Sequence, residues 1–329
     1  MVNNQLETLI FNESVPFLER ALAVFEYQYS SVSIYKEFCD QLQRTPKNVR
    51  SLQQIPFLPI EFFKYHKLLT TDRGFEKLFR SSGTTGQVKS NHFVADLSIY
   101  EQAIINGFRH QYGDVSKYCI LGLLPSYLER KDASLVHMID FLMQASDHKH
   151  NGFYLDNLST LQNTLRRLID QQQPTILIGV TFALLDLAEQ YPMNLDDVIV
   201  METGGMKGRR EEMTRSQLHK QLKQAFKVPL IHSEYGMTEL LSQAYFTESG
   251  HFQPSPTMRI LIREINDPFA YQEEGKSGAL NIVDLANLYS CSFIATQDIG
   301  KAYKNNHFDV LGRIDASDLR GCNLMVVED

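Results

Sequence analysis

The amino-acid sequence predicts an α/β protein in which layered sheet strands are covered by helices on both faces. Through the middle of the chain, short apolar runs typical of buried strands alternate with stretches of helical periodicity. Such alternation is typical of a sheet with helices on both sides. After Thr257 the pattern changes to short strands separated by turns, which predicts a small β-rich subdomain closing over the sheet. With 329 residues, 43% of them hydrophobic, the chain can bury a sizeable core.

The predicted elements follow one another along three regions of the chain. We expect an N-terminal helical segment packed on the core (1–75), an α/β core (76–256) and a β-rich closing subdomain with a C-terminal tail (257–329). Helical spacing covers residues 5–45, and prolines make 47–59 irregular. The predicted strands are 77–80, 91–95, 118–124, 175–179, 197–201, 229–233, 260–264, 279–284 and 292–296. The predicted helices are 97–112, 134–144, 158–172, 182–190, 215–226 and, by its apolar pattern, 240–245.

Charge and cysteine content exclude several classes of protein. The formal net charge is −7, whereas a nucleic-acid protein needs a basic face. No apolar stretch is long enough for a membrane span, and the N-terminus lacks the pattern of a signal peptide, so we expect a cytoplasmic protein. The cysteines are far apart and have no CxxC spacing, which argues against a zinc site or disulfide framework. They are Cys39, Cys119, Cys291 and Cys322, and the first three lie in patterns typical of the core.

A loop rich in glycine and hydroxyl side chains carries the most chemical information. It reads Ser81-Ser82-Gly83-Thr84-Thr85-Gly86 and is followed by Lys89, between two predicted strands. Glycines allow tight turns, and successive backbone N–H groups can then cradle phosphate oxygens. The spacing is not that of the Walker loop, which precedes a helix. The loop therefore predicts a nucleotide triphosphate site, and the plainer alternative is a flexible polar hairpin turn.

Three further motifs follow the loop. They are Tyr235-Gly236-Met237-Thr238-Glu239, Thr296-Gln297-Asp298 and Gly312-Arg313-Ile314-Asp315. In this order the motifs resemble those of adenylate-forming enzymes, which include acyl-CoA synthetases, luciferases and peptide-synthetase adenylation domains. Within that superfamily, residues 204–211, 232–239 and 320–324 are most similar to the acyl-protein synthetases of bacterial bioluminescence, the LuxE-like family. The resemblance implies the N-terminal core of an adenylate-forming enzyme as the fold.

The resemblance also implies a role for each motif. The loop from Ser81 to Gly86, with Lys89, would hold the β- and γ-phosphates of ATP. Gly204 and Gly205 would line the adenine pocket, and Tyr235, beside Gly236, would pack on the adenine. Thr238 would contact the α-phosphate, and Glu239 would hold Mg²⁺. Asp298 would bind the ribose hydroxyls, and Arg313 would contact ribose or phosphate. Carboxylate oxygen suits both a hard cation and paired ribose hydroxyls.

Some of these residues also have plainer interpretations. Glu239 would be a favourable charge at the N-terminus of the helix predicted at 240–245. Asp298 would cap a turn, and Tyr235 would be an ordinary core aromatic. These alternatives stay open at the level of the sequence.

Most adenylate-forming enzymes continue for about another domain, which swings and delivers a lysine to the active site. We expect this chain to lack that mobile C-terminal domain and its lysine. Another group must then stabilise charge during adenylation, and the candidates are Lys89, Lys207, Arg209 and Arg210. The cluster 207–210 is equally consistent with solvated charge before a helix. The surface that usually binds coenzyme A belongs partly to the missing domain. The resemblance therefore supports coenzyme A as a cofactor less strongly than it supports ATP and Mg²⁺.

Cys322 is a candidate acyl carrier. In the LuxE-like family, a cysteine near the C-terminus receives the acyl group as a thioester. A thiolate attacks a mixed anhydride readily, and the neighbouring Arg320 would lower the thiol pKa. A short tail would let the sulfur reach the adenylate and then a partner. The alternative is a small buried hydrophobe beside Leu324.

The sequence therefore predicts an enzyme that activates a carboxylic acid, a fatty acid being the favoured class, to an acyl-adenylate and passes the acyl group to a thiol. The acceptor is Cys322, coenzyme A or a carrier-protein arm, and candidate partners are an acyl-accepting reductase or an acyl carrier protein. One alternative is a stand-alone acyl- or aryl-CoA ligase. Another is a non-catalytic subunit that binds nucleotide or acyl groups in a larger complex.

Overall fold

The computed structural model describes residues 2–82, 88–125, 132–155, 157–204 and 213–314. The helices of these segments are α1 (Val2–Phe11), α2 (Phe17–Ser31), α3 (Ser33–Gln41), α4 (Phe62–Tyr65), α5 (Leu97–Tyr112), α6 (Ser134–Ser146), α7 (Leu158–Asp170), α8 (Thr181–Gln190) and α9 (Arg215–Phe226). The strands are β1 (Leu58–Pro59), β2 (Lys77–Arg80), β3 (Asn91–Val94), β4 (Cys119–Leu123), β5 (Gly152–Tyr154), β6 (Thr175–Val180), β7 (Val198–Thr203), β8 (His232–Tyr235), β9 (Ala244–Phe246), β10 (Phe252–Pro254), β11 (Met258–Arg263), β12 (Ser277–Asp284), β13 (Phe293–Ala302) and β14 (Phe308–Arg313).

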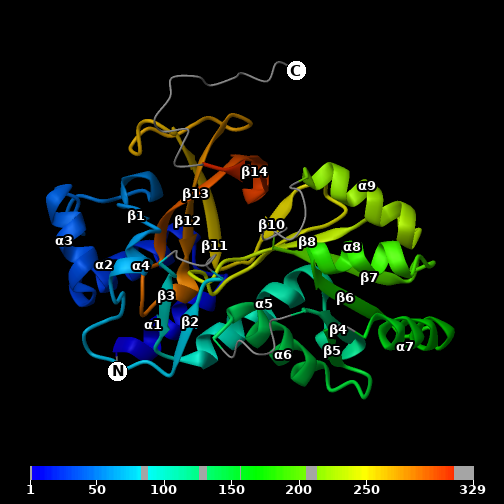
Figure 1. The fold of residues 1–329 in the computed structure, drawn as a ribbon. Helices are drawn as coiled ribbons and strands as arrows, with labels where there is room; N and C mark the ends of the chain where they lie inside the picture. The colour runs from blue at the N-terminus through cyan, green and yellow to red at the C-terminus, as the bar shows by residue number, and fades with distance from the viewer. Residues whose placement is uncertain (1, 83–87, 126–131, 156, 205–212, 315–329) are drawn as a thin grey trace.

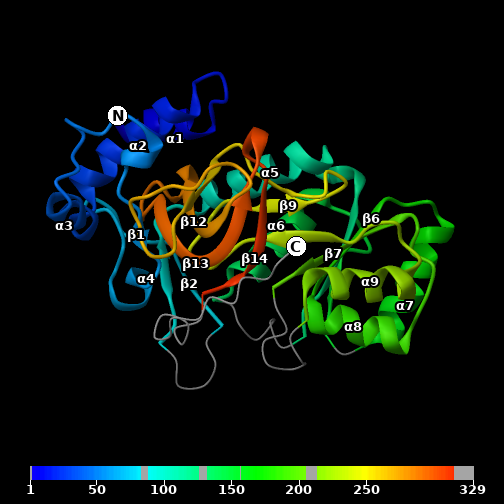
Figure 2. The same ribbon diagram turned by 90° about the horizontal axis from the view of Figure 1, so that it is seen from above.

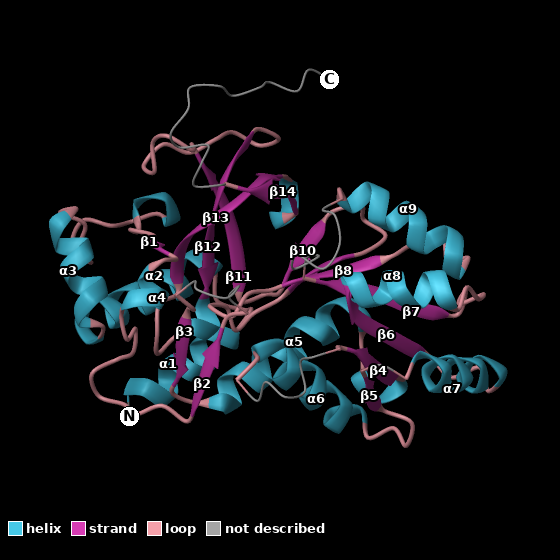
Figure 3. Ribbon diagram, in the orientation of Figure 1, coloured by secondary structure: helices cyan, strands magenta, loops and turns pink. Residues whose placement is uncertain are grey.

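One large mixed sheet organises the molecule (Figure 3). Its order is β11-β12-β13-β14-β10-β9-β8-β7-β6-β4-β5, and β1 pairs with β13. From β8 to β5 the neighbouring strands are parallel. From β8 to β11 they are antiparallel, and the added strand β1 runs parallel to β13. The parallel strands are apolar runs such as Cys119–Leu123, every residue of which is buried. Strands buried on both faces read in this way because helices cover both sides of the sheet.

Helices cover both faces of the parallel strands. Figure 1 and Figure 2 show α5 and α6 on one side and α8 and α9 on the other. Helix α5 illustrates why these residues are helical. Asp96 caps its start by accepting a hydrogen bond from the Ser98 N–H, and Gly113 ends it with a φ of 79°. Its apolar face, which includes Ile104 and Phe108, is buried in the core.

The N-terminal helices pack on the antiparallel half of the sheet. Phe25 of α2 and Tyr35 of α3 contact the ring of Phe293 at the start of β13. The buried amide of Gln28 donates hydrogen bonds to the carbonyls of Asn287 and Leu288. These contacts join the first forty residues to the β-rich part of the chain, far along the sequence.

The predicted α/β fold class is confirmed, and most predicted elements occur within a few residues of their expected bounds. The strands β1, β5, β9, β10 and β14 and the short helix α4 were not predicted. Strands after Thr257 occur as expected, but β14 pairs with β10 and so continues the main sheet. The division into three regions stays a prediction.

The helix predicted at 240–245 is wrong. Leu241 and Ser242 form a bend, and Ala244–Phe246 is the strand β9. The buried carboxylate of Asp284 explains the difference, because it accepts hydrogen bonds from the N–H groups of Leu241 (2.8 Å) and Ser242 (2.9 Å). These N–H groups therefore have a tertiary partner in place of a helical carbonyl.

Within the described residues, no helix combines the length and hydropathy that crossing a bilayer requires.

Candidate functional site

The two ends of the hydroxyl- and glycine-rich loop are joined at its base. Strands β2 and β3 form an antiparallel hairpin that pairs Arg80 with Asn91. Beyond this pair, the N–H of Ser81 donates to the Ser90 carbonyl (3.2 Å), and the N–H of Ser90 donates to the Ser81 hydroxyl (2.9 Å). Ser82 and Lys89 are exposed just above this base. The loop residues Gly83, Thr84, Thr85 and Gly86 lie outside the described residues.

Glu239 lies directly beside this loop base. It follows β8 in the turn Thr238–Glu239, and its side chain is 7% exposed. Burial raises the pKa of Glu239, while a hydrogen bond with the Ser90 side chain and the positive charges of Arg313 and Lys64 oppose the increase. A buried carboxylate whose charge is incompletely balanced is typical of a site that receives a cation.

His92, which the sequence did not single out, fixes this turn from the other side. It is fully buried on β3, with Nδ1 2.8 Å from the Thr238 carbonyl oxygen and Nε2 3.0 Å from the Ser290 hydroxyl. Because a carbonyl only accepts, Nδ1 carries the proton and Nε2 accepts from Ser290. Burial lowers the pKa of His92 to about 4, which keeps the ring neutral. The strand that leaves the loop thus anchors the Thr238–Glu239 turn.

A second group of motif residues gathers where β8, β13 and β14 meet. The Tyr235 hydroxyl donates to Asp298 Oδ2 (2.7 Å), and Arg313 Nε lies 3.9 Å from Asp298 Oδ1. Asp298 and Arg313 are direct partners across β13 and β14. Burial raises the pKa of Asp298, and the Tyr235 hydrogen bond and the charge of Arg313 oppose this. Arg313 remains 62% exposed, so its guanidinium is available to a ligand.

The plainer interpretations of these residues are only partly correct. Asp298 lies inside β13, so the interpretation as a turn cap is wrong. The loss of the helix at 240–245 also removes the helix N-terminus that was the alternative for Glu239. The Tyr235 ring does pack on core aromatics, with centroids 5.9 Å from Phe252 and 5.5 Å from Phe308. Tyr235 is therefore part of the core and also presents its hydroxyl to Asp298.

Two glycines shape the backbone at the ends of β7 and β8. Gly204 has a φ of 68°, a conformation that side chains rarely tolerate, and its carbonyl accepts from the Thr181 hydroxyl (2.6 Å). Gly236 opens the turn that leads to Glu239. A Cβ atom added to Gly236 would lie 2.4 Å from Glu234 Oε1. The conformation of Gly204 therefore favours glycine, and a side chain at Gly236 would have to displace the Glu234 carboxylate.

Several candidate residues lie outside the described part of the chain. They are Gly205, Lys207, Arg209, Arg210 and Cys322, together with the loop residues 83–86. The other cysteines, Cys39, Cys119 and Cys291, are buried as predicted, and burial raises the pKa of each thiol to about 12. None of these three is suited to nucleophilic attack at neutral pH.

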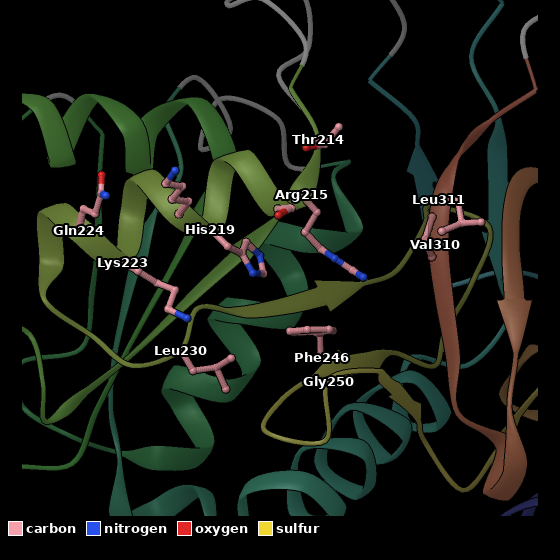
Figure 4. Close-up of a pocket in the computed structure, with 12 residues that line it drawn as sticks. Thr214, Arg215, His219, Lys223, Gln224, Leu230, Phe246, Gly250, Val310 and Leu311 are labelled. Atoms are coloured by element: carbon pink, nitrogen blue, oxygen red, sulfur yellow. The ribbon is translucent and has the colours of Figure 1, made fainter. Parts of the chain in front are cut away.

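An open groove lies between α9 and β14 (Figure 4). Its volume is about 820 Å³, and basic side chains of α9, including Lys220 and Lys223, face the apolar Phe246 and Leu311. Arg215 crosses the groove toward β14, where it lies 3.3 Å from Asp309, and its guanidinium stacks over Phe246 at 4.5 Å. None of the candidate nucleotide residues lines the groove. We therefore place the candidate site at the convergence of Ser90, Glu239 and Asp298 instead.

Ser90, His92 and Asp284 are the site's supporting residues that sequence reasoning missed. Ser90 and His92 could have been suspected only from their position directly after the loop. The partners of His92 lie 146 and 198 residues away along the chain, so no local pattern marks it.

Comparison with known proteins identifies the family of the chain. The model of the family described as "Acyl-protein synthetase, LuxE" matches residues 9–329. The "Long-chain-fatty-acid--luciferin-component ligase" of Aliivibrio fischeri is 24% identical over 328 residues, covering 91% of this chain and 85% of that protein.

Solved structures confirm the fold of adenylate-forming ligases. An open conformation of 2-hydroxyisobutyryl-CoA ligase, in complex with 2-HIB-AMP and CoA, has a TM-score of 0.67 at 11% identity and covers 91% of this chain and 74% of its own. ATP-bound MatB from Rhodopseudomonas palustris has a TM-score of 0.55 at 14% identity and covers 74% of this chain. The chain spans 50% of the length of that MatB structure.

Proposed function

This chain belongs to the LuxE acyl-protein synthetase family, and on that premise we propose that it activates a fatty acid with ATP and passes the acyl group to a thiol. The hydrogen bond of His92 with the Thr238 carbonyl (2.8 Å) carries the proposal. With the Ser90 side chain beside the Glu239 carboxylate, it brings the base of a phosphate-type loop next to a buried carboxylate. A magnesium-bound triphosphate needs both groups within one site. The name of the Aliivibrio fischeri relative supports long-chain fatty acids as the substrate class.

In this proposal, ATP lies between the two groups of motif residues. Backbone N–H groups and hydroxyls of the loop from Ser81 to Gly86, with Lys89, bind the β- and γ-phosphates. Asp298 accepts hydrogen bonds from the ribose hydroxyls, and Arg313, which is close to it, binds ribose or phosphate. The adenine lies against Tyr235 and the backbone at Gly204 and Gly236, with Gly205 as a further candidate. The positive φ of Gly204 and the absence of a Cβ at Gly236 support a close backbone approach.

The residues around Glu239 are consistent with Mg²⁺. No cluster of three or more metal-ligating side chains occurs among the described residues. Mg²⁺ does not require one, since it is usually held by one or two carboxylates together with substrate phosphates. Such a cation would offset the free-energy cost of the buried negative charge, which is the cause of the raised pKa of Glu239. Held by Glu239 and the phosphates, with Thr238 at the α-phosphate, Mg²⁺ would neutralise charge on the triphosphate.

The first half-reaction joins the acid to AMP. A carboxylate oxygen of the substrate attacks the α-phosphorus, the new P–O bond forms, and the bond to pyrophosphate breaks. Charge that develops at the α-phosphate needs fixed donors nearby. Thr238 and Arg313 are our candidates for these donors, which is supported by the contacts of His92 with the Thr238 backbone and of Arg313 with Asp298. Lys89, Lys207, Arg209 and Arg210 are the further candidates.

The second half-reaction transfers the acyl group to sulfur. A thiolate attacks the acyl carbonyl, the thioester C–S bond forms, and AMP leaves with the electron pair of the broken C–O bond. Cys322 is our candidate thiol within the chain, because burial raises the thiol pKa of Cys39, Cys119 and Cys291 to about 12. From Cys322 the acyl group would pass to an acyl-accepting reductase or to an acyl carrier protein.

Acid-dependent exchange of labelled pyrophosphate into ATP tests the first half-reaction. We expect exchange with long-chain fatty acids and Mg²⁺, and none without the acid. The complete absence of exchange across fatty and aromatic acids would favour a non-catalytic nucleotide- or acyl-binding subunit.

The C322S variant tests the second half-reaction. It should keep pyrophosphate exchange but lose the hydroxylamine-sensitive acyl label on the protein, whereas C39S should keep both. Undiminished labelling of C322S would exclude Cys322 as the carrier. Acyl transfer to coenzyme A at an unchanged rate in C322S would identify an acyl-CoA ligase instead.

A further inference from the structure

Glu234 is a buried carboxylate whose two oxygens face two different backbone turns. It lies on β8, one residue before Tyr235, and is 9% exposed. Its Oε2 accepts a hydrogen bond from the Thr203 hydroxyl at 2.5 Å. Its Oε1 lies under Gly236, at the place where a side chain on that residue would begin.

These two contacts join the ends of neighbouring strands. Thr203 is the last residue of β7 and is the direct partner of Glu234 in the parallel pair β7–β8. Gly204 follows Thr203 with a φ of 68°, and Gly236 opens the turn that leads to Thr238 and Glu239. In an α/β sheet, ligands bind outside the carboxyl ends of the strands, where such turns meet. The Glu234 carboxylate therefore contacts the carboxyl ends of both strands, by a hydrogen bond at Thr203 and by close packing at Gly236, beside residues assigned to the nucleotide.

The surroundings of Glu234 make this bridge costly to the fold. Burial raises its pKa to about 7, with the Thr203 hydrogen bond opposing and the nearby charge of Glu202 reinforcing the increase. In the part of the chain that the structure describes, no ion pair from lysine or arginine reaches Glu234. A buried carboxylate without a cation costs folding free energy, and such groups are concentrated at functional sites.

We propose that Glu234 is a positioning residue, which fixes the separation between the turn at Gly204 and the turn at Gly236 and so holds the adenine side of the site at the width of the nucleotide. It touches the two turns and acts through them, without contacting the reacting atoms. This inference rests on the proposed function, because the walls that it positions are those assigned to ATP. A nucleotide that binds between two preformed walls loses less entropy than one that must order them.

Two substitutions at Glu234 separate positioning from burial. E234A removes the bridge and should raise the KM for ATP in pyrophosphate exchange on the order of tenfold, the loss expected for a hydrogen bond to a charged group. E234Q keeps an acceptor for Thr203 and should stay within about threefold of the wild-type KM. Both variants should keep the KM for the fatty acid within about twofold of the wild-type value, because they change only one wall of the nucleotide site.

A second pair of variants tests the contact with Gly236. G236A places a methyl group against Glu234 Oε1 and should raise the KM for ATP. E234A/G236A removes the clash and should bind ATP better than G236A alone, a sign of direct coupling. G107A is the matched control, because its added Cβ would also meet a buried oxygen, Ser255 Oγ, at 2.4 Å, but on helix α5. G107A should lower thermal stability without a selective change in the KM for ATP.

Thermal unfolding of every variant separates loss of fold from loss of positioning. An E234A protein that folds and has an unchanged KM for ATP would overturn the inference, as would an E234A/G236A variant no better than G236A. If G236A does not fold, the KM for ATP of E234A, compared with that of E234Q, still decides whether Glu234 positions the nucleotide site. Absence of exchange in the wild-type protein would instead overturn the proposed function, so the two failures are distinguishable.

Discussion

The Nδ1 atom of His92 donates a hydrogen bond to the carbonyl oxygen of Thr238 at 2.8 Å. This contact joins the strand that leaves the phosphate-type loop to the turn that carries Glu239. With the Ser90 side chain beside Glu239, it gives the loop and the carboxylate a common support. The proposed magnesium–triphosphate site depends on this support.

Replacement of His92 should weaken both the fold and the site. H92F leaves the Thr238 carbonyl without its donor and should lower the free energy of unfolding by roughly 1–3 kcal/mol. H92N places an amide N–H near the position of Nδ1 and should recover much of that loss. Urea unfolding and pyrophosphate exchange measure the two effects.

S290A is the control for His92, since it removes only the partner of Nε2. It should reduce exchange less than H92F does. Equal exchange rates in H92F and the wild type would show that the turn does not need this anchor.

Glu239 should be necessary for activity but not for stability. Burial raises its pKa, so its charge costs folding free energy in the absence of a cation. E239Q should therefore unfold at the same temperature as the wild type or a higher one. Its pyrophosphate exchange should fall on the order of 100-fold or more, because the proposed Mg²⁺ ligand is lost. The control E264Q, at an exposed position, should change neither the unfolding temperature nor the exchange rate. Retained exchange in E239Q would contradict the assignment of Glu239 as the Mg²⁺ ligand.

The stability of the protein should depend on pH through Glu234. Its folded-state pKa is about 7, above the ordinary value of 4.5, so between these values the folded state holds the extra proton. The contribution of Glu234 to the free energy of unfolding is therefore lost as pH rises from about 4.5 to 7. Glutamine does not titrate, so E234Q should not show this loss. The groups that face Glu234 are Thr203, Glu202, Tyr100, Tyr112 and Tyr245.

The difference between E234Q and the wild type is the quantity to measure. His92 and His232, whose pKa values burial lowers to about 4, give the opposite slope between pH 4 and 6.5 in both proteins. Relative to the wild type, E234Q should gain up to about 3 kcal/mol in its free energy of unfolding between pH 4.5 and 7.5. A constant difference across this range would show that the pKa of Glu234 is not raised.

Asp284 should be among the most sensitive positions for stability. Its carboxylate accepts from the N–H groups of Leu241, Ser242 and Ala286, and from the Ser242 hydroxyl at 2.6 Å. D284A leaves these buried donors unpaired and should lower the free energy of unfolding by roughly 3 kcal/mol or more. D267A, which removes one exposed turn contact, should cost less than about 1 kcal/mol. Similar losses in the two variants, measured by urea unfolding, would contradict this role.

Local signals made much of the fold predictable. Helix α5 has its bounds at Leu97 and Tyr112 as expected, because Asp96 and Gly113 mark its ends and its apolar spacing is regular. The segment 240–245 was mispredicted because the carboxylate that holds it, Asp284, lies over forty residues away. Short strands such as β10 have too few residues for a period to be recognised.

The candidate site was predictable where its motifs are contiguous. Glu239 and Asp298 were identified from ordered motifs, and the structure places each beside a partner, Ser90 and Tyr235 respectively. His92 could not be identified, because its importance arises only when β3 meets the Thr238 turn in space. Glu234 was visible as part of a motif, but its bridge to Thr203 depends on the register of two parallel strands.

A crystal structure with Mn²⁺ and a non-hydrolysable ATP analogue tests the central claim most directly. We predict an anomalous Mn²⁺ peak on the Glu239 carboxylate, with the triphosphate against the loop that begins at Ser81 and the ribose at Asp298. Nucleotide bound elsewhere, for example in the basic groove between α9 and β14, with no metal at Glu239, would contradict it.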